Sequence, residues 1–398
     1  MDVSDKRKRP PRCVFYSHDT MGFGHIRRNM LLSQTVLKAC PDAEVLLISG
    51  VREAGSFALP AGADSLILPS YIKTSEGKYF PRSLGKDVKS LVRLRSQLIY
   101  AALNAFSPDI MVVDNVPRGA MRELDLSLPL LTKKKTHMVL GLRDIIDSPE
   151  AVKKQWSKQD NTSAINLFYS TIWVYGDKTL YDLRKEYFSA LSFRQKIAFT
   201  GYLDASNRHR LTAYSASSHS SPYLLCLVGG GQDGFHLAET FARAEFPVGV
   251  RGILVTGSMM PPAQRKALSQ LVVQRPHMKM LEFVAEPLGL LRDARAVVAM
   301  GGYNTVIEIL TLNKNALIVP RVDPRQEQWI RAERLAQRGL IDCIHPHQLT
   351  VGSLSRWLAR QHHFADPREL LDFGGLDYIG ESVRSILADR VTTRERVS

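Results

Sequence analysis

The sequence predicts an α/β protein with two domains, each built on a parallel sheet. Short apolar runs alternate with helical stretches along nearly the whole chain, a pattern typical of parallel sheets. The length of 398 residues exceeds an ordinary single core. The predicted strands cover residues 13–17, 44–49, 66–68, 110–113, 138–140, 172–174, 197–199, 224–227, 253–255, 280–283, 297–299 and 317–319.

A polar, serine-rich segment at residues 205–221 separates two glycine-punctuated strands and predicts an interdomain linker. It divides the chain into a first domain over residues 1–204 and a second over residues 222–374. Apolar residues then recur at helical spacing within residues 375–398, at Leu376, Ile379, Val383 and Ile386. This spacing predicts a C-terminal helix.

The most informative motif lies around residues 296–312. A buried strand ends before Gly301 and Gly302, and a helix follows from Thr305. The unpaired amides and dipole at a helix N-terminus favour a pyrophosphate. Glu308 shares a face with Asn304 and Thr305, and its carboxylate can accept hydrogen bonds from the hydroxyls of a ribose. The alternative is a strand that ends in an ordinary glycine turn, followed by a helix with a glutamate in its first turn. The sequence fits this interpretation equally well.

The segment 300–340 resembles the C-terminal domain of family 28 glycosyltransferases, the GT-B group that includes the peptidoglycan N-acetylglucosaminyltransferases. It is more similar still to uncharacterised bacterial proteins described as glycosyltransferases. The resemblance implies two Rossmann-like domains facing a cleft, with the acceptor over the first domain and a nucleotide-sugar donor in the second. It also implies that the helix in residues 375–398 crosses back to the first domain.

The resemblance assigns donor contacts to individual positions. It places Phe283 near the base, Glu308 on the ribose, and the pair Glu327 and Gln328 on the sugar hydroxyls. The peptidoglycan enzymes have Gln-Gln at this pair, so the resemblance does not identify the donor sugar. The residues that it places at the diphosphate are Gly301, Gly302, Asn304 and Thr305.

A second glycine cluster, residues 228–234, follows a predicted strand and precedes a helix that begins near Phe235. It lacks the Gly-Lys-Ser/Thr ending of a Walker A loop. It resembles the first loop of the family's second domain, which adds Gly230, Gly231 and Gln232 to the donor site. The alternative is a flexible turn between strand and helix.

A third turn, residues 22–25, stands at the end of the first strand, where open α/β sheets bind ligands. Gly24 and His25 match a glycine-histidine turn of GT-B proteins, and a neutral imidazole can take a proton from an acceptor hydroxyl. A polar helix start is the simpler alternative. Asp114 ends another strand and is the second candidate for the base or for orienting it, although a helix-capping aspartate would look the same. Arg143 and Asp144 share that ambiguity.

The net charge of +14 and a pI of about 9.6 predict attraction to anionic partners, either a charged acceptor or an anionic membrane surface. Nucleic acid is disfavoured because no nucleic-acid-binding motif accompanies the basic groups. Residues 86–106 form a basic amphipathic helix, and packing on its own sheet is favoured over lying on lipid. No apolar run of membrane-spanning length occurs, which predicts a cytoplasmic protein, with a peripheral place on the inner membrane face as the alternative.

The sequence predicts neither a metal site nor a cofactor. His345 and His347 form a close pair without a third ligand at a characteristic spacing, and no Asp-x-Asp element is present. The charge of a departing diphosphate would then be met by backbone amides, helix ends and Arg321 or Arg325.

Together these features predict a hexosyltransferase that moves a sugar from a nucleotide diphosphate-sugar to a hydroxyl acceptor. By resemblance the donor is a UDP-sugar and the anomeric carbon is inverted. The resemblance does not identify the acceptor, for which a lipid-linked molecule and a polysaccharide are both candidates. Two alternatives stay open. A nucleotide-sugar 2-epimerase of the same layout needs no acceptor, and a non-enzymatic basic α/β protein would only bind an anionic polymer.

Overall fold

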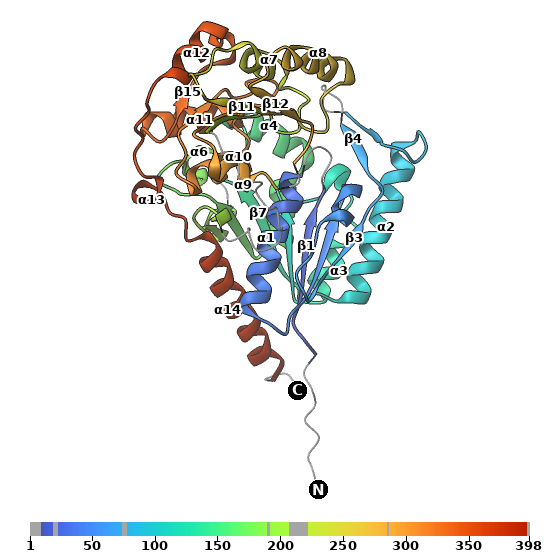
Figure 1. Ribbon diagram of the computed structural model, residues 1–398. Coiled ribbons are helices and arrows are strands. Elements are labelled where there is room, and N and C mark those ends of the chain that lie inside the picture. The colour runs from blue at the N-terminus through green and yellow to red at the C-terminus, as the bar shows by residue number, and fades with distance from the viewer. Residues whose placement is uncertain are drawn as a thin grey trace.

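The computed structural model describes residues 9–18, 23–73, 78–188, 192–206, 222–284 and 286–395, and it contains two parallel sheets (Figure 1). The first has the strand order β3-β2-β1-β6-β7-β8-β9 and the second β12-β11-β10-β13-β14-β15. The prediction of an α/β fold with two parallel-sheet domains is confirmed. The strands are β1 (Arg12–Ser17), β2 (Glu44–Ser49), β3 (Ala63–Ile67), β6 (Ile110–Asp114), β7 (His137–Arg143), β8 (Thr171–Tyr175), β9 (Ile197–Phe199), β10 (Tyr223–Leu227), β11 (Arg251–Val255), β12 (Met278–Leu281), β13 (Ala296–Ala299), β14 (Ala316–Ile318) and β15 (Asp342–Cys343), with a separate antiparallel hairpin of β4 (Tyr71–Lys73) and β5 (Tyr79–Pro81).

Helices cover the two faces of each sheet because the strands are apolar on both sides. Within each sheet the direction of winding reverses once, between β1 and β6 and between β10 and β13. Such switch points open a crevice beyond the carboxyl ends of the strands. The helices are α1 (Gly24–Ala39), α2 (Val88–Phe106), α3 (Leu128–Lys133), α4 (Pro149–Gln159), α5 (Asn161–Phe168), α6 (Leu183–Glu186), α7 (Phe235–Arg243), α8 (Pro262–Val273), α9 (Leu288–Asp293), α10 (Tyr303–Thr311), α11 (Glu327–Gln337), α12 (Val351–Ala359), α13 (Pro367–Leu370) and α14 (Gly375–Glu395).

Some details differ from the prediction: β3 lies over Ala63–Ile67 rather than 66–68, and α10 begins at Tyr303 rather than Thr305. The strand expected over 280–283 ends at Leu281, so Phe283 lies in the loop that follows. The hairpin β4–β5 and the edge strand β15 were not predicted, because they are two or three residues long and carry no apolar run. Residues 207–221 of the expected linker lie outside the described part of the chain, and the domain bounds stay a prediction.

Helix α2 packs its apolar stripe, Leu91, Ile99 and Leu103, against its own domain. Its buried Arg95 forms a two-pronged ion pair with the buried Glu123, with nitrogen–oxygen distances of 2.5 and 2.7 Å. The structure therefore agrees with the favoured interpretation that this helix packs on its own domain. Contact with a membrane remains a prediction. Within the described ranges, no helix combines the length and apolarity that a membrane crossing requires.

The C-terminal helix α14 lies beside α1 on the first domain (Figure 1). Ile379 and Val383 of α14 are buried in the same apolar cluster as Met30, Leu31 and Val36 of α1. Gly380 also faces α1, and a Cβ added there would make ordinary van der Waals contact with the Ala39 side chain at 3.6 Å. The chain thus returns from the second sheet to the first through a packed helix pair.

The substitution Ile379→Ala is expected to lower the free energy of unfolding by about 2–5 kcal/mol, because it leaves a cavity in this helix contact. Urea denaturation monitored by circular dichroism measures the change. The exposed neighbour Glu381 supplies the control, and Glu381→Ala should shift the transition by less than about 0.5 kcal/mol. Equal effects of the two substitutions would show that α14 is not held by its buried face.

Candidate functional site

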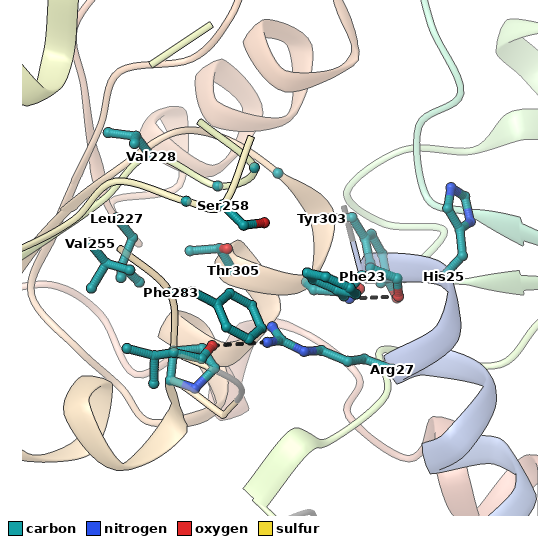
Figure 2. Close-up of a pocket in the computed structure, with 18 of the residues that line it drawn as sticks. Phe23, His25, Arg27, Leu227, Val228, Val255, Ser258, Phe283, Tyr303 and Thr305 are labelled. Atoms are coloured by element: carbon teal, nitrogen blue, oxygen red, sulfur yellow. Dashed lines mark hydrogen bonds between the residues drawn. The ribbon is translucent and has the colours of Figure 1, made fainter. Parts of the chain in front are cut away.

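A cavity of about 270 Å³ lies where the carboxyl ends of the two sheets face each other (Figure 2). The first domain contributes the beginning of α1 and Arg143 at the end of β7. The second contributes the turns after β10 and β11, the loop after β12 and the beginning of α10. Both switch points therefore open into one space.

His25 and Asp114 are in direct contact on the first-domain side. His25 lies in the first turn of α1, and Asp114 is the last residue of β6, which pairs with β1. Because β1 and β6 are adjacent and parallel, their carboxyl ends bring the two side chains together. The His25 Nδ1 atom lies 2.5 Å from Asp114 Oδ2, and only His25 lines the cavity.

Arg28 completes this cluster from one helical turn further along α1. Its Nη2 atom lies 2.7 and 2.6 Å from the two Asp114 oxygens and 3.0 Å from His25 Nδ1. Burial by itself raises the pKa of the Asp114 carboxyl, but the charges and hydrogen bonds of Arg28 and His25 outweigh it and hold the pKa well below its usual range. Asp114 is therefore a buried carboxylate that fixes the orientation of the imidazole ring.

The N-terminus of α10 forms the opposite wall. Gly302 is its N-cap and no side chain caps this end, so the first backbone amides have no acceptor within the helix. Gly302 and Thr305 line the main cavity and also a second one of about 200 Å³ beside it. A helix end of this kind binds anions through its amides and its dipole.

The turns after β10 and β11 approach each other too closely for side chains. Gly231 has a φ of +97°, and a Cβ there would lie 2.3 Å from the Thr256 carbonyl oxygen. Gly257 has a φ of +80°, and its Cβ would lie 2.4 Å from the Gly229 carbonyl oxygen. Glycine is thus required at both positions, and the backbone itself forms this part of the wall.

The far end of the cavity is apolar. Leu227, Val255 and Pro287 line it together with Phe283, which is 43% exposed. The Phe283 ring lies 5.2 Å from the ring of Phe23, which comes from the other domain. In Figure 2, Arg27 of α1 reaches the same end, where its Nη2 atom donates a hydrogen bond of 3.2 Å to the Val284 carbonyl. Such a surface suits a flat, partly apolar group such as a nucleobase.

Most residues that the sequence singled out lie on these cavities. His25, Gly24, Phe283 and Asn304 line the main one, Gly231, Gln232 and Gln328 the second, and Gly230, Gly302 and Thr305 both. Asp114 lines neither cavity, but its side chain contacts His25. Gly301, Glu308 and Glu327 do not line either cavity.

Glu308 differs most from its expected place. Its side chain is 2% exposed and lines a separate space of about 20 Å³ beside Arg28 and Leu203. The Asn304 Nδ2 atom donates a 2.8 Å hydrogen bond to the Gly24 carbonyl, and Asn304 lines both this space and the main cavity. Asn304 therefore stands between the main cavity and Glu308.

Glu327 is 3% exposed and faces arginines rather than an open sugar pocket. Its Oε1 atom accepts a 2.7 Å hydrogen bond from Arg321. Burial raises the pKa of this carboxyl, but Arg143, Arg321 and two further arginines together lower it below its usual value. Glu327 is thus an ionised group that organises the cations around it, and Gln328 is the member of the pair that reaches the second cavity.

Several residues of the site were not predicted from the sequence. Arg28 could have been found, because a residue three positions after His25 shares its helix face. Ser258 lines the cavity from the turn after β11 and Tyr303 from the first position of α10, and neither placement leaves a sequence signature. Among the described residues, no group of three or more His, Cys, Asp or Glu side chains comes together as a metal site.

The two domains and the shared cavity are those of the GT-B fold, which this chain has. A curated, uncharacterised glycosyltransferase of Methanosarcina acetivorans is 23% identical over 313 residues, which cover 75% of this chain and 77% of that protein. No protein-family model matches the sequence, so the likeness to family 28 remains a resemblance.

Two solved structures share the fold at low identity. The spinosyn rhamnosyltransferase SpnG, complexed with thymidine diphosphate, superposes with a TM-score of 0.54 at 16% identity, over 97% of this chain and 100% of that one. The UDP-GlcNAc 2-epimerase from Neisseria meningitidis, bound to UDP-GlcNAc, superposes with a TM-score of 0.59 at 12% identity, over 96% and 100%. At these identities the two structures establish the fold alone.

The substitution Asp114→Asn is expected to destabilise the protein at neutral pH by about 3–5 kcal/mol, because it leaves Arg28 buried without its carboxylate. The pKa of Asp114 is lower in the folded protein than in the unfolded chain, where it is about 3.9. The carboxylate therefore stabilises the fold fully at pH values above about 3.9, and this stabilisation is lost as the pH falls toward the pKa of the folded state. The difference between wild type and variant should therefore narrow below about pH 4.

Urea unfolding between about pH 7 and pH 3 measures this difference. The exposed Asp42 provides the control, and Asp42→Asn should follow the wild-type curve throughout. A constant gap between the wild type and Asp114→Asn across this range would contradict the proposed electrostatic role of the buried carboxylate.

Proposed function

We propose that this protein is a glycosyltransferase that moves a sugar from a nucleotide diphosphate-sugar to a hydroxyl acceptor. The observation that carries the proposal is that His25, held by Asp114, lines the same cavity as the uncapped N-terminus of α10. One wall offers a base and the other offers donors to a diphosphate. A sugar between them would have its anomeric carbon within reach of both.

The donor lies mainly against the second domain. The apolar end at Phe283 suits the base, and the amides and hydroxyl at the start of α10 suit the diphosphate. The sugar would extend toward Gln232 and Gln328 in the second cavity. The thymidine diphosphate and UDP-GlcNAc held by the two related structures support a nucleoside diphosphate as the ligand class.

The reaction is an in-line displacement with inversion. The acceptor oxygen forms a bond to the anomeric carbon as the bond from that carbon to the diphosphate oxygen breaks, and this oxygen keeps the electron pair. The acceptor proton moves to His25 Nε2 while Nδ1 stays against Asp114, which stabilises the resulting imidazolium. The backbone amides of α10 and nearby side chains meet the charge of the diphosphate without a metal ion.

The acceptor enters over the first domain, where His25 stands. Arg27, Arg28 and Arg143 line the cavity on this side, and none of the lining residues in the described part of the chain is acidic. A hydroxyl acceptor that also carries negative charge fits this surface, whether it is lipid-linked or a polysaccharide. Contact with an anionic membrane would serve a lipid-linked acceptor.

A nucleotide-sugar 2-epimerase is the second candidate, because an epimerase is among the structures of this fold and has the TM-score of 0.59 given above. The two functions differ in their need for an acceptor. Incubating the protein with UDP-GlcNAc alone and following the sugar by NMR separates them, since an epimerase converts the sugar at C2 and a transferase leaves it unchanged.

The substitution Gly302→Val is expected to abolish donor binding without unfolding the protein. Nothing lies within 4 Å of a Cβ at this position, and the φ of −60° and ψ of 137° are open to any residue. The added isopropyl group would occupy the space in front of the α10 amides, where the diphosphate binds.

A thermal-shift screen against UDP-, TDP- and GDP-sugars tests this substitution. At a concentration 100 times the dissociation constant, a bound donor stabilises the wild type by about 2.7 kcal/mol. Gly352 of α12 also has open space at its Cβ, and Gly352→Val should keep the wild-type response. If no sugar nucleotide stabilises the wild type, the proposed function is wrong. If Gly302→Val is still stabilised as the wild type is, the diphosphate does not bind at this helix end.

The substitution His25→Gln is expected to reduce kcat by about 10²–10⁴-fold, because the acceptor proton loses its base. The donor KM should stay unchanged, since His25 lies on the acceptor side. Steady-state release of nucleoside diphosphate measures both constants. The exposed His363 provides the control variant His363→Gln, and similar kcat values for the two variants would exclude His25 as the base.

A further inference from the structure

Arg143 stands apart from the other arginines around the site. It is the last residue of β7, next to the strand that ends in Asp114, and its side chain lines the main cavity together with Gly230 and Thr305. It thus reaches from the first domain toward the wall that would hold a diphosphate. The resemblance to known families assigns it no role.

Four of the neighbouring arginines have carboxylate partners. The Arg143 Nε atom is buried without a hydrogen bond, and no described residue forms an ion pair with this guanidinium. The distances for the others are 2.6 Å for Arg28–Asp114, 2.6 Å for Arg331–Asp144, 2.7 Å for Arg321–Glu327 and 4.0 Å for Arg325–Asp147. Arg321 and Arg325, which the sequence suggested for the leaving group, are therefore already engaged.

The surroundings of Arg143 are unfavourable for its charge. Burial, together with Arg331, Arg28 and Arg325, lowers the pKa of the guanidinium to about 10, and Glu327 offsets only part of this effect. Arg143 remains protonated at neutral pH. A cation in this position gains more from an anion in the cavity than an exposed arginine would.

The position of Arg143 depends on contact between the domains. The next residue, Asp144, pairs with Arg331 of α11, whose Nη1 atom also donates a 3.0 Å hydrogen bond to the Gly301 carbonyl. This bridge ties the end of β7 to the glycine turn before α10. Arg143 can therefore approach the helix N-terminus only while the first and second domains are joined at this point.

We propose that Arg143 is the cation that binds the donor diphosphate from the first domain and stabilises it as it leaves. This inference rests on the proposed function and adds a residue to it. When the bond between the anomeric carbon and the diphosphate oxygen breaks, the electron pair remains on that oxygen, and the guanidinium donates hydrogen bonds to the departing diphosphate. Arg143 thereby makes leaving-group stabilisation dependent on contact between the two domains.

Calorimetric titration of the full-length chain with nucleotides tests the proposal. UDP, TDP and GDP identify the preferred base, and the corresponding monophosphate is the comparison ligand. Arg143→Gln should weaken diphosphate binding by about 10- to 100-fold and monophosphate binding much less, because the outer phosphate loses a charged partner. Arg143→Lys, which keeps the charge, should recover part of the affinity. It also serves as the test if the glutamine variant does not fold.

Arg93 on the exposed face of α2 provides a control with the same change in net charge, and Arg93→Gln should bind both nucleotides as the wild type does. Equal weakening of mono- and diphosphate binding in Arg143→Gln, or no weakening, would overturn the inference while leaving the proposed function intact. A wild-type protein that binds none of the three diphosphates would refute both. In turnover, kcat of Arg143→Gln should fall by about 10²–10³-fold.

Discussion

The site depends on one buried ion pair between the two domains. Arg331 and Asp144 are both fully buried, with an Nη2–Oδ1 distance of 2.6 Å and an Nε–Oδ2 distance of 2.9 Å. Tyr202 donates a further hydrogen bond to Asp144, and Arg331 bonds to the Gly301 carbonyl. Removing one partner of such a pair costs about 3–5 kcal/mol. The pair fixes the distance between the carboxyl ends of the two sheets, and with it the width of the cavity.

The two walls of the cavity have different chemistry, and this difference follows from their origin. The first domain supplies His25 and the cationic side chains of Arg27, Arg28 and Arg143, while the second supplies backbone amides, glycine turns and apolar surface. A nucleotide would lie on the second wall, and reaction charge would develop between the walls.

The sequence predicted the fold well because parallel strands are apolar on both faces and end in glycine or polar turns. It placed Asp114 and His25 at strand ends, and the strand order then brought them together. It could not predict contacts that depend on how two domains meet. The burial of Glu308 and Glu327, the pairing of Arg331 with Asp144 and the exposure of Arg143 to the cavity all depend on side chains that are distant in the sequence.

The surroundings of Glu308 show which contacts would have to break for a ribose to reach it. The space of about 20 Å³ beside it has room for little more than one water molecule and cannot admit a ribose. Asn304, held to the Gly24 carbonyl at 2.8 Å, stands between this space and the main cavity. A ribose can reach Glu308 only after this hydrogen bond breaks and α10 separates from α1. The bond joins the two domains, so a ribose role for Glu308 requires the domains to part for the donor and close again for the transfer.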